Sequence, residues 1–293
     1  MATDENSNQV DLSRFTSNIP PFPKCVQRVL TMLRDPRIQL TKVAEVVSLD
    51  QGFAGKVLRM ANSAYFGLPR RVYNVTEALV LLGYANVRNV LISASASNIL
   101  STAVEAYGLD AGCLWEHSVG TAYAAQMLSR KIGMQVYSMA FSCGLLHDVG
   151  KVAIDLALPD ESKAEMRSLI RSRGVLAAEL ATVGVTHSQV GGEICRRWNL
   201  PEEIIDAVSY HHKPWECSEN RVIAGVVATA DRCSHLLLEG SNLTVHHLAD
   251  LPDGSYVPDA QSLRRLSDEL PAMVASSKEL LQAVAEPEPE HLT

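Results

Sequence analysis

The chain has 293 residues, of which 47% are hydrophobic and only 5% aromatic, and its formal net charge is −7. This length can bury one large core or two modest ones, and the scarcity of aromatic side chains favours helices over strands. The sequence contains no run of about 18 uninterrupted apolar residues. Its amino terminus also lacks a basic segment followed by an apolar segment, the pattern of a signal peptide. We therefore expect a cytoplasmic protein with neither a membrane span nor a signal peptide.

The distribution of charged residues and cysteines limits which partners and which metal sites the chain can have. Residues 1–100 carry 11 Lys and Arg against 7 Asp and Glu, whereas residues 101–293 carry 15 against 26. The first third could therefore accept a negatively charged partner, although two ordinary solvated surfaces explain the same asymmetry. The six cysteines include no C-x-x-C pair, which is typical of free thiols in a reducing compartment and argues against a cysteine-based zinc site.

The first 100 residues have the pattern of short helices. Residues 1–18 are polar, and we expect them to be disordered. Prolines then mark a turn at 19–23, and apolar residues at helical spacing predict about five helices over 20–100. Asp50 is a candidate amino-terminal cap for one of these helices, and Gly83 is a candidate stop for another.

The rest of the chain continues in the same way, without any strand or hairpin pattern. Asp110 is a candidate cap for a long helix over 111–131. The tail, 285–293, is rich in Glu and Pro, and we expect it to be disordered. Further helices are predicted near 136–148, 160–173, 176–184, 188–198, 202–210, 221–238 and 261–284. The fold class that these patterns predict is all-α.

A candidate metal-binding motif follows the apolar helix near 136–148. His147 and Asp148 are adjacent, so one nitrogen and one oxygen ligand can reach the same cation. Lys151 lies four residues after His147 and shares its helix face if the helix continues, where its ammonium group would suit a phosphate oxygen. A His-Asp pair alone is weak evidence, because such pairs often lie on the surface.

Other histidine and aspartate residues add to this pair. His117 lies within a predicted helix, His187 precedes one, and His211 and His212 end one. Asp231 lies within an apolar helix, where a carboxylate is costly unless it is paired or bound to a metal. Mixed imidazole and carboxylate ligands suit iron, manganese, zinc or nickel, and the set is large enough for one or two ions.

Each of these residues also has a purely structural explanation. His117 alone would more often be a hydrogen-bonded core histidine, and Asp231 could pair with Arg232 or a helix terminus. His211 and His212 could stabilise the end of a helix through its dipole. A buried, fully hydrogen-bonded relic of a metal site remains a third alternative.

Several stretches of the first half, taken together with this order of residues, resemble a known family. Residues 19–23 resemble an opening proline turn, and 48–51 resemble a D-P segment in which Gln51 replaces proline. Residues 58–67, LRMANSAYFG, resemble the most characteristic stretch of that family, and 75–83, VTEALVLLG, resemble the next helix and its glycine cap. The chain is therefore similar over roughly 12–240 to the HDOD domain, the HD-related output domain of bacterial signalling proteins, within the HD superfamily of metal-dependent phosphohydrolases.

The resemblance implies an N-terminal helical lobe over 19–105, an HD-like bundle over 106–240 and C-terminal helices over 241–284. It also places a set of residues where HD and HD-GYP phosphodiesterases keep metal ligands or a phosphate-binding lysine. In this sequence the ligand positions are His117, His147, Asp148, His187, His211, His212 and Asp231, and the lysine is Lys151.

Two features depart from the HD-GYP pattern. No Gly-Tyr-Pro loop follows His212, and Cys113 stands where those enzymes can carry a metal-bridging Glu. Both departures argue against hydrolysis of cyclic di-GMP, but neither argues against metal binding.

Two functions remain open on this basis. The first is a signalling output protein that has a divalent-metal site and acts on a protein partner or through a bound nucleotide or phosphate. The second is a metal-dependent phosphohydrolase or phosphodiesterase, in which Asp148 and Lys151 take part in catalysis, with a nucleotide or cyclic dinucleotide as substrate. No feature indicates a membrane or a specific nucleic acid as partner.

Overall fold

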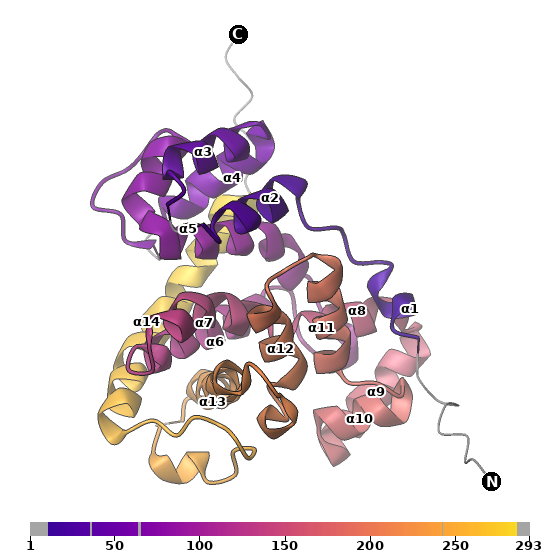
Figure 1. The fold of residues 1–293 in the computed structure, drawn as a ribbon. Coiled ribbons are helices and arrows are strands. Elements are labelled where there is room, and N and C mark those ends of the chain that lie inside the picture. Colours follow the sequence, from indigo (N-terminus) through magenta and orange to yellow (C-terminus); the bar gives the residue numbers. More distant parts are fainter. Residues whose placement is uncertain (1–10, 36, 64–65, 242, 286–293) are drawn as a thin grey trace, which may run out of the picture.

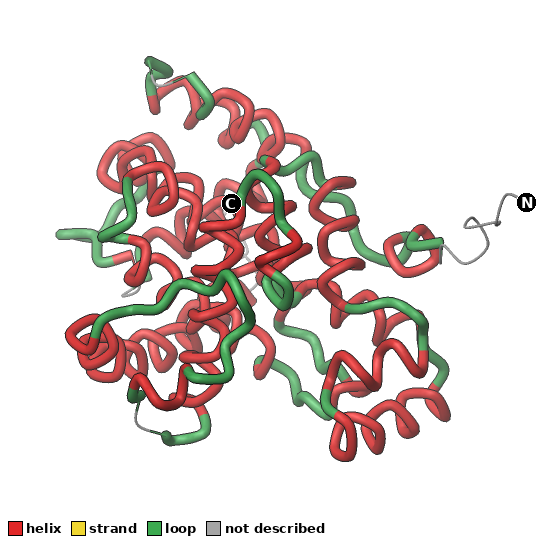
Figure 2. The backbone as a smooth tube through the Cα atoms, turned by 60° about the horizontal axis from the view of Figure 1, so that its bottom comes forward, coloured by secondary structure: helices red, strands yellow, loops and turns green. Residues whose placement is uncertain are grey.

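In the computed structural model, residues 11–285 are described except 36, 64–65 and 242, and the only regular elements among them are helices (Figures 1 and 2). The all-α expectation is confirmed. The α-helices are α1 (Ser13–Thr16), α2 (Lys24–Met32), α3 (Leu40–Ser48), α4 (Gln51–Ala61), α5 (Val75–Leu100), α6 (Cys113–Ser129), α7 (Met134–Leu146), α8 (Val149–Ala157), α9 (Asp160–Arg173), α10 (Val175–Thr182), α11 (His187–Arg197), α12 (Glu202–Tyr210), α13 (Arg221–Leu238) and α14 (Ala260–Ala285).

Helices α2 to α5 form an N-terminal lobe at one end of the molecule (Figure 1). Two residues predicted to mark the ends of helices do so in this lobe. The Asp50 carboxylate caps α4 by accepting a hydrogen bond from the Phe53 amide at 3.0 Å. Gly83 interrupts α5 with φ 70° and ψ 168°, a conformation that side-chain-bearing residues rarely adopt, so the α5 segment is two helices that meet at an angle.

Helix α5 is the one helix among the described residues that is long and apolar enough to span a membrane by length and composition. In this fold 56% of its apolar window is buried. Val87, Val90 and Leu91 are fully buried, as expected for a helix in the core of a folded domain.

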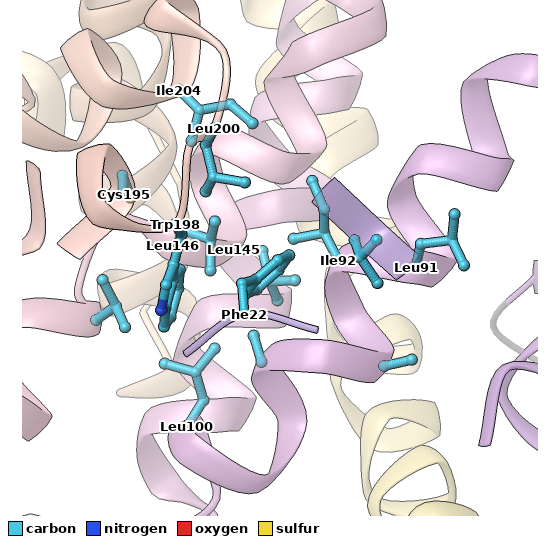
Figure 3. Close-up of a cluster of buried hydrophobic side chains, with 14 of the residues drawn as sticks. Phe22, Leu91, Ile92, Leu100, Leu145, Leu146, Cys195, Trp198, Leu200 and Ile204 are labelled. Atoms are coloured by element: carbon cyan, nitrogen blue, oxygen red, sulfur yellow. The ribbon is translucent and has the colours of Figure 1, made fainter. Parts of the chain in front are cut away.

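One hydrophobic core extends from the lobe into the bundle (Figure 3), and a second, smaller cluster lies mainly among α6, α13 and α14. Phe22, in the proline turn, stacks on Trp198 at the end of α11 with ring centroids 4.7 Å apart. The Trp198 indole N–H donates to the Pro20 carbonyl at 3.0 Å. The turn that precedes the lobe therefore fastens it to the bundle, and the boundaries predicted between lobe and bundle do not separate two cores.

The expectation of disorder over 1–18 is wrong for its last part, whereas 1–10 lie outside the described residues. Phe15 in α1 is buried, and the Arg14 guanidinium donates to the Val183 carbonyl at 3.0 Å. One aromatic side chain within a polar segment was enough to fix α1 against α8 and α11.

The bundle is built from α6 to α13, and α14 runs along its side up to the lobe (Figure 1). Helix α6 begins after Gly112, whose φ is 88°, and the expected Asp110 side-chain cap is not made. A Cβ atom added at Gly144 of α7 would lie 2.7 Å from the Ala122 Cα of α6, so this glycine permits the close crossing of the two helices.

The chain leaves helical geometry between α7 and α8. Asp148 has φ −101° and ψ 6°, so His147 and Asp148 occupy a sharp corner between two helices. Gly150, at the start of α8, packs directly on the backbone of α11. A Cβ atom there would overlap the His187 carbonyl and lie 2.7 Å from the Gly191 amide nitrogen.

We predict that Gly150→Ala lowers the free energy of unfolding by about 3 kcal/mol or more, because the added methyl group must displace the backbone of α11. Gly52→Ala is the matched control, since its Cβ would meet only the Asp50 carboxylate at 3.8 Å. In the control, stability should stay the same or rise by up to about 1 kcal/mol. Urea unfolding measures both changes, and equal stability of the two variants would contradict the close α8–α11 packing.

Candidate metal centre

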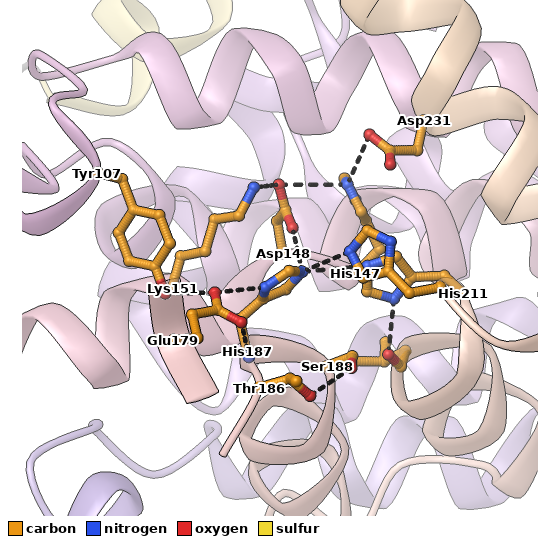
Figure 4. Close-up of polar contacts among 12 residues, drawn as sticks. Tyr107, His147, Asp148, Lys151, Glu179, Thr186, His187, Ser188, His211 and Asp231 are labelled. Atoms are coloured by element: carbon orange, nitrogen blue, oxygen red, sulfur yellow. Dashed lines mark hydrogen bonds and ion pairs between the residues drawn. The ribbon is translucent and has the colours of Figure 1, made fainter. Parts of the chain in front are cut away.

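Five separate parts of the fold bring histidine and aspartate side chains to one place (Figure 4). They are the first half of α6, the corner between α7 and α8, the first residue of α11, the turn after α12, and the middle of α13. The residues, in that order, are His117; His147 and Asp148; His187; His211 and His212; and Asp231. The structure thus brings together all seven residues predicted as ligands.

Four of these residues form what we call the first ligand group: His117, His147, Asp148 and Asp231. The Nε2 atoms of the two histidines are 3.3 Å apart, and His117 Nε2 lies 3.0 Å from Asp231 Oδ1. Asp148 Oδ2 lies 3.3 Å from His147 Nε2 and 3.6 Å from His117 Nε2. Ligand atoms bound to one ion at about 2.0–2.2 Å are separated by about such distances.

The second ligand group consists of His187, His211 and His212. His187 Nε2 lies 3.3 Å from His211 Nε2 and 3.0 Å from His212 Nε2. Asp148 links the two groups, because its Oδ1 lies 3.2 Å from His187 Nε2 while its Oδ2 faces the first group. One carboxylate therefore presents an oxygen to each group.

Hydrogen bonds to the opposite ring nitrogens orient three of the histidines. His147 Nδ1–H donates to the Gly144 carbonyl at 2.7 Å, and His211 Nδ1–H donates to the Val208 carbonyl at 2.8 Å. His187 Nδ1–H donates to the Glu179 carboxylate at 2.6 Å. Each bond turns Nε2 toward the centre, which is the usual arrangement of histidines that bind a metal.

Without an ion, protons balance the buried carboxylates. Burial disfavours a charge on His147, but the carboxylates of Asp148 and Asp231 outweigh it and raise its pKa to about 10. The pKa of His187 is also raised, because Glu179 and Asp148 overcome the effect of its burial. The same pairing overcomes burial at Asp148 and Asp231 and holds their pKa values well below the usual range.

The other two histidines of the second group are neutral at pH 7. Burial, together with the neighbouring imidazoles, lowers the pKa of His211 well below its usual value. Burial and the charge on His187 lower the pKa of His212 to about 4. Both therefore offer an unprotonated Nε2, the form that binds a metal ion.

Lys151 is at the edge of the first ligand group. Its Nζ donates to Asp148 Oδ2 at 2.6 Å and lies 5.8 Å from the centre of the Tyr107 ring. Burial would lower the Lys151 pKa, but Asp148 and Asp231 outweigh it and raise the pKa above its ordinary value. The side chain is therefore a permanent cation beside the carboxylates.

Both ligand groups face a pocket of about 740 Å³. Arg232 and His235 of α13 add basic groups to its wall, and Glu116 and Asp250 add acidic ones. The remainder is largely apolar and comes from distant parts of the chain: Leu109, Ile170, Val175, Leu238, Leu251 and Pro252. The pocket is thus large enough for a small organic molecule that carries an anionic group.

Sequence reasoning missed two residues that belong to this centre, Glu179 and Tyr107. Glu179 is fully buried in α10, and its carboxylate accepts hydrogen bonds from His187 and from the Tyr107 hydroxyl. A single carboxylate within an apolar helix was the signal that drew attention to Asp231, and the same signal was present in α10. His235, which is not among the predicted ligands, also lines the pocket.

The donor set fits a divalent transition metal. It combines five imidazoles with two carboxylates. Each ligand group has at least one buried histidine, and one oxygen of Asp148 lies close to each group. Hard ions such as calcium prefer sets made of oxygen alone, so iron, manganese, zinc or nickel suits this centre better.

Solved structures support the fold. A candidate phosphohydrolase from Shewanella amazonensis SB2B superimposes with a TM-score of 0.73 over 94% of this chain and 98% of its own, at 20% identity. An HDOD domain protein of unknown function from Geobacter sulfurreducens gives a TM-score of 0.66 over 94% and 97%, at 24% identity.

Among curated proteins, an uncharacterized protein of Treponema pallidum is 28% identical over 73% of this chain and 42% of its own length. Ribonuclease Y of Petrotoga mobilis is 30% identical over 44% of this chain and 19% of its own length. The chain thus spans less than half of each of these two relatives.

The profile of the HDOD domain matches residues 19–214, which is two thirds of the sequence. The match covers the N-terminal lobe and every residue of the two ligand groups except Asp231. This chain belongs to the HDOD domain family.

Proposed function

We propose that this protein is a metal-dependent phosphohydrolase that acts in the cytosol on a phosphoester bound in the pocket. The observation that carries the proposal is the position of Asp148, which joins two ligand groups beside a permanent lysine cation at the pocket wall. Asp148, Lys151 and the three histidines of the second ligand group border the same pocket.

A bound divalent metal would lower the pKa of a water molecule and polarise a phosphoryl oxygen. The residues of this chain supply the rest. His147, Asp148, His187 and His211 are buried, which keeps bulk water away from the floor of the pocket. Lys151 stands beside Asp148, where its ammonium group would stabilise negative charge that develops on the phosphoryl oxygens.

The wall of the pocket would hold the rest of the substrate. Arg232 can neutralise a second anionic group, while Leu109 and Ile170 provide apolar contact area for an organic moiety. A nucleotide or another small phosphoester has both features. The ribonuclease name of the Petrotoga mobilis relative makes a phosphodiester the first bond type to test.

A second function, signalling through contact with a protein partner, rests on a different observation. The N-terminal lobe carries several large apolar side chains that are substantially exposed: Leu49, Tyr73, Val80, Leu81 and Tyr84. Exposed apolar surface of this kind often marks protein contacts. We propose a signalling protein as partner of the lobe, a role that is compatible with hydrolysis in the bundle.

Purified protein should contain about two equivalents of iron, manganese, zinc or nickel, one for each ligand group. The measurement is inductively coupled plasma mass spectrometry on protein prepared anaerobically without a histidine tag. The His147→Ala, Asp148→Ala double variant should lose both ions, because it removes the carboxylate that the groups share. Metal content that is zero in both proteins after reconstitution would rule out the phosphohydrolase.

Metal binding should release protons. At pH 7 the metal-free protein carries a proton on His147 Nε2, whose pKa is about 10, and the pKa of His187 is also raised. An ion that binds to His147 must displace this proton, so affinity should increase with pH up to about 10. Calorimetric titrations at pH 7 in buffers of different ionisation enthalpy should report the release of at least one proton, and a pH-independent affinity would contradict this account.

The metal-loaded protein should hydrolyse bis-p-nitrophenyl phosphate. Lys151→Ala should lower kcat by about 10²- to 10³-fold while both ions stay bound, since the lysine acts on the transition state and not on the metal. The control is Lys131→Ala, because Lys131 is an exposed residue that pairs with Asp259 away from the pocket. Equal turnover by the Lys151 variant and wild type would exclude the proposed role of this lysine.

A further inference from the structure

Glu179 carries a buried charge that metal ligation itself does not use. Its side chain is fully buried in α10 and accepts three hydrogen bonds. Two come from His187, from Nδ1–H at 2.6 Å and from the backbone amide at 2.9 Å, and the third comes from the Tyr107 hydroxyl at 2.7 Å (Figure 4). Burying a carboxylate is costly, so its presence calls for a specific function.

The three oriented histidines differ in the acceptor that they use. His147 and His211 donate to carbonyls three residues earlier, Gly144 and Val208, which belong to their own helices. His187 is the first residue of α11, and no helical turn precedes it. A carbonyl of its own helix is therefore unavailable, and a side chain from another helix has to accept the Nδ1 proton.

Helix capping accounts for only one of these contacts. Thr186 and Gln189 form a capping box at the start of α11, and Glu179 Oε2 adds to it by accepting the His187 backbone N–H. The bond that His187 Nδ1–H donates to Glu179 Oε1 does not involve the backbone of the helix. Its effect is on the ring, which it holds with Nε2 facing His211, His212 and Asp148.

Tyr107 in turn fixes Glu179. The short 3₁₀ segment Glu105–Tyr107 is held in place because the Ala106 amide donates to the buried Asp155 carboxylate at 2.7 Å. From this position the Tyr107 hydroxyl reaches the same oxygen of Glu179 that accepts from His187 Nδ1. The result is a chain of contacts from Tyr107 through Glu179 to His187.

We propose that Glu179 is a positioning residue that gives the second ligand group its ability to hold a metal ion, and that Tyr107 fixes Glu179 for this purpose. The proposal rests on the proposed function in so far as the second group binds an ion at all. It assigns Glu179 to one group only, because His117, His147 and Asp231 make no contact with it among the interactions of the described residues.

The test is a competition titration of metal-free protein with Mn²⁺ for wild type, Glu179→Gln and Tyr107→Phe. Both variants keep the shape of the side chain and remove only the charge or the hydroxyl group. The second ion should bind about 10- to 100-fold more weakly in Glu179→Gln and less so in Tyr107→Phe, with the first ion unchanged. Glu193→Gln, at a half-buried position of α11 that pairs with Arg196, is the control and should bind both ions as wild type does.

The outcomes separate the two proposals. Two ions bound with wild-type affinity by Glu179→Gln and Tyr107→Phe would overturn the role of Glu179 and leave the phosphohydrolase intact. Equal weakening of both ions, with altered far-ultraviolet circular dichroism, would make Glu179 a general structural residue and overturn the role as well. No ion bound by wild type would overturn the proposed function itself.

Discussion

The contacts of the buried Asp148 carboxylate are the interactions on which the arrangement of this centre depends. Asp148 takes up the corner between α7 and α8, touches both ligand groups and pairs with Lys151. A buried carboxylate is stable only if positive charge surrounds it. The helices that supply that charge converge on this point, so the architecture of the bundle and the chemistry of the centre have the same cause.

The corner also explains why glycine is required close to the centre. Asp148 can face His187 only if α8 comes into direct contact with α11, and Gly150 makes that contact possible. The core that joins α11 to the N-terminal lobe, through Trp198 and Phe22, then connects the centre to the part of the molecule with exposed apolar side chains.

Much of this could be predicted from sequence, because it depends on local signals. The Asp50 cap, the break at Gly83 and the helical spacing of apolar residues are short-range features, and all of them appear in the structure. The convergence of seven histidine and aspartate residues was predicted from a resemblance to a family, since spacing alone does not place five helical segments together. Their role as ligands is still a prediction.

What sequence reasoning missed is long-range. Phe15 orders α1 by a contact with distant helices, and the residue that orients His187 is a carboxylate from α10. Helical geometry is interrupted at Asp148, which makes α8 a separate helix. Neither His147 nor Asp148 at this corner is a glycine or proline that would have signalled the interruption. The expected Asp110 cap failed because Gly112, with a positive φ, begins α6 instead.

Electron paramagnetic resonance of the manganese-loaded protein tests most directly whether Asp148 would serve a metal ion in each ligand group. Two Mn²⁺ ions bridged by one carboxylate are magnetically coupled. We predict that one equivalent of Mn²⁺ gives the spectrum of an isolated ion and that two equivalents give the spectrum of a coupled pair. A spectrum of uncoupled ions at every stoichiometry would contradict the account.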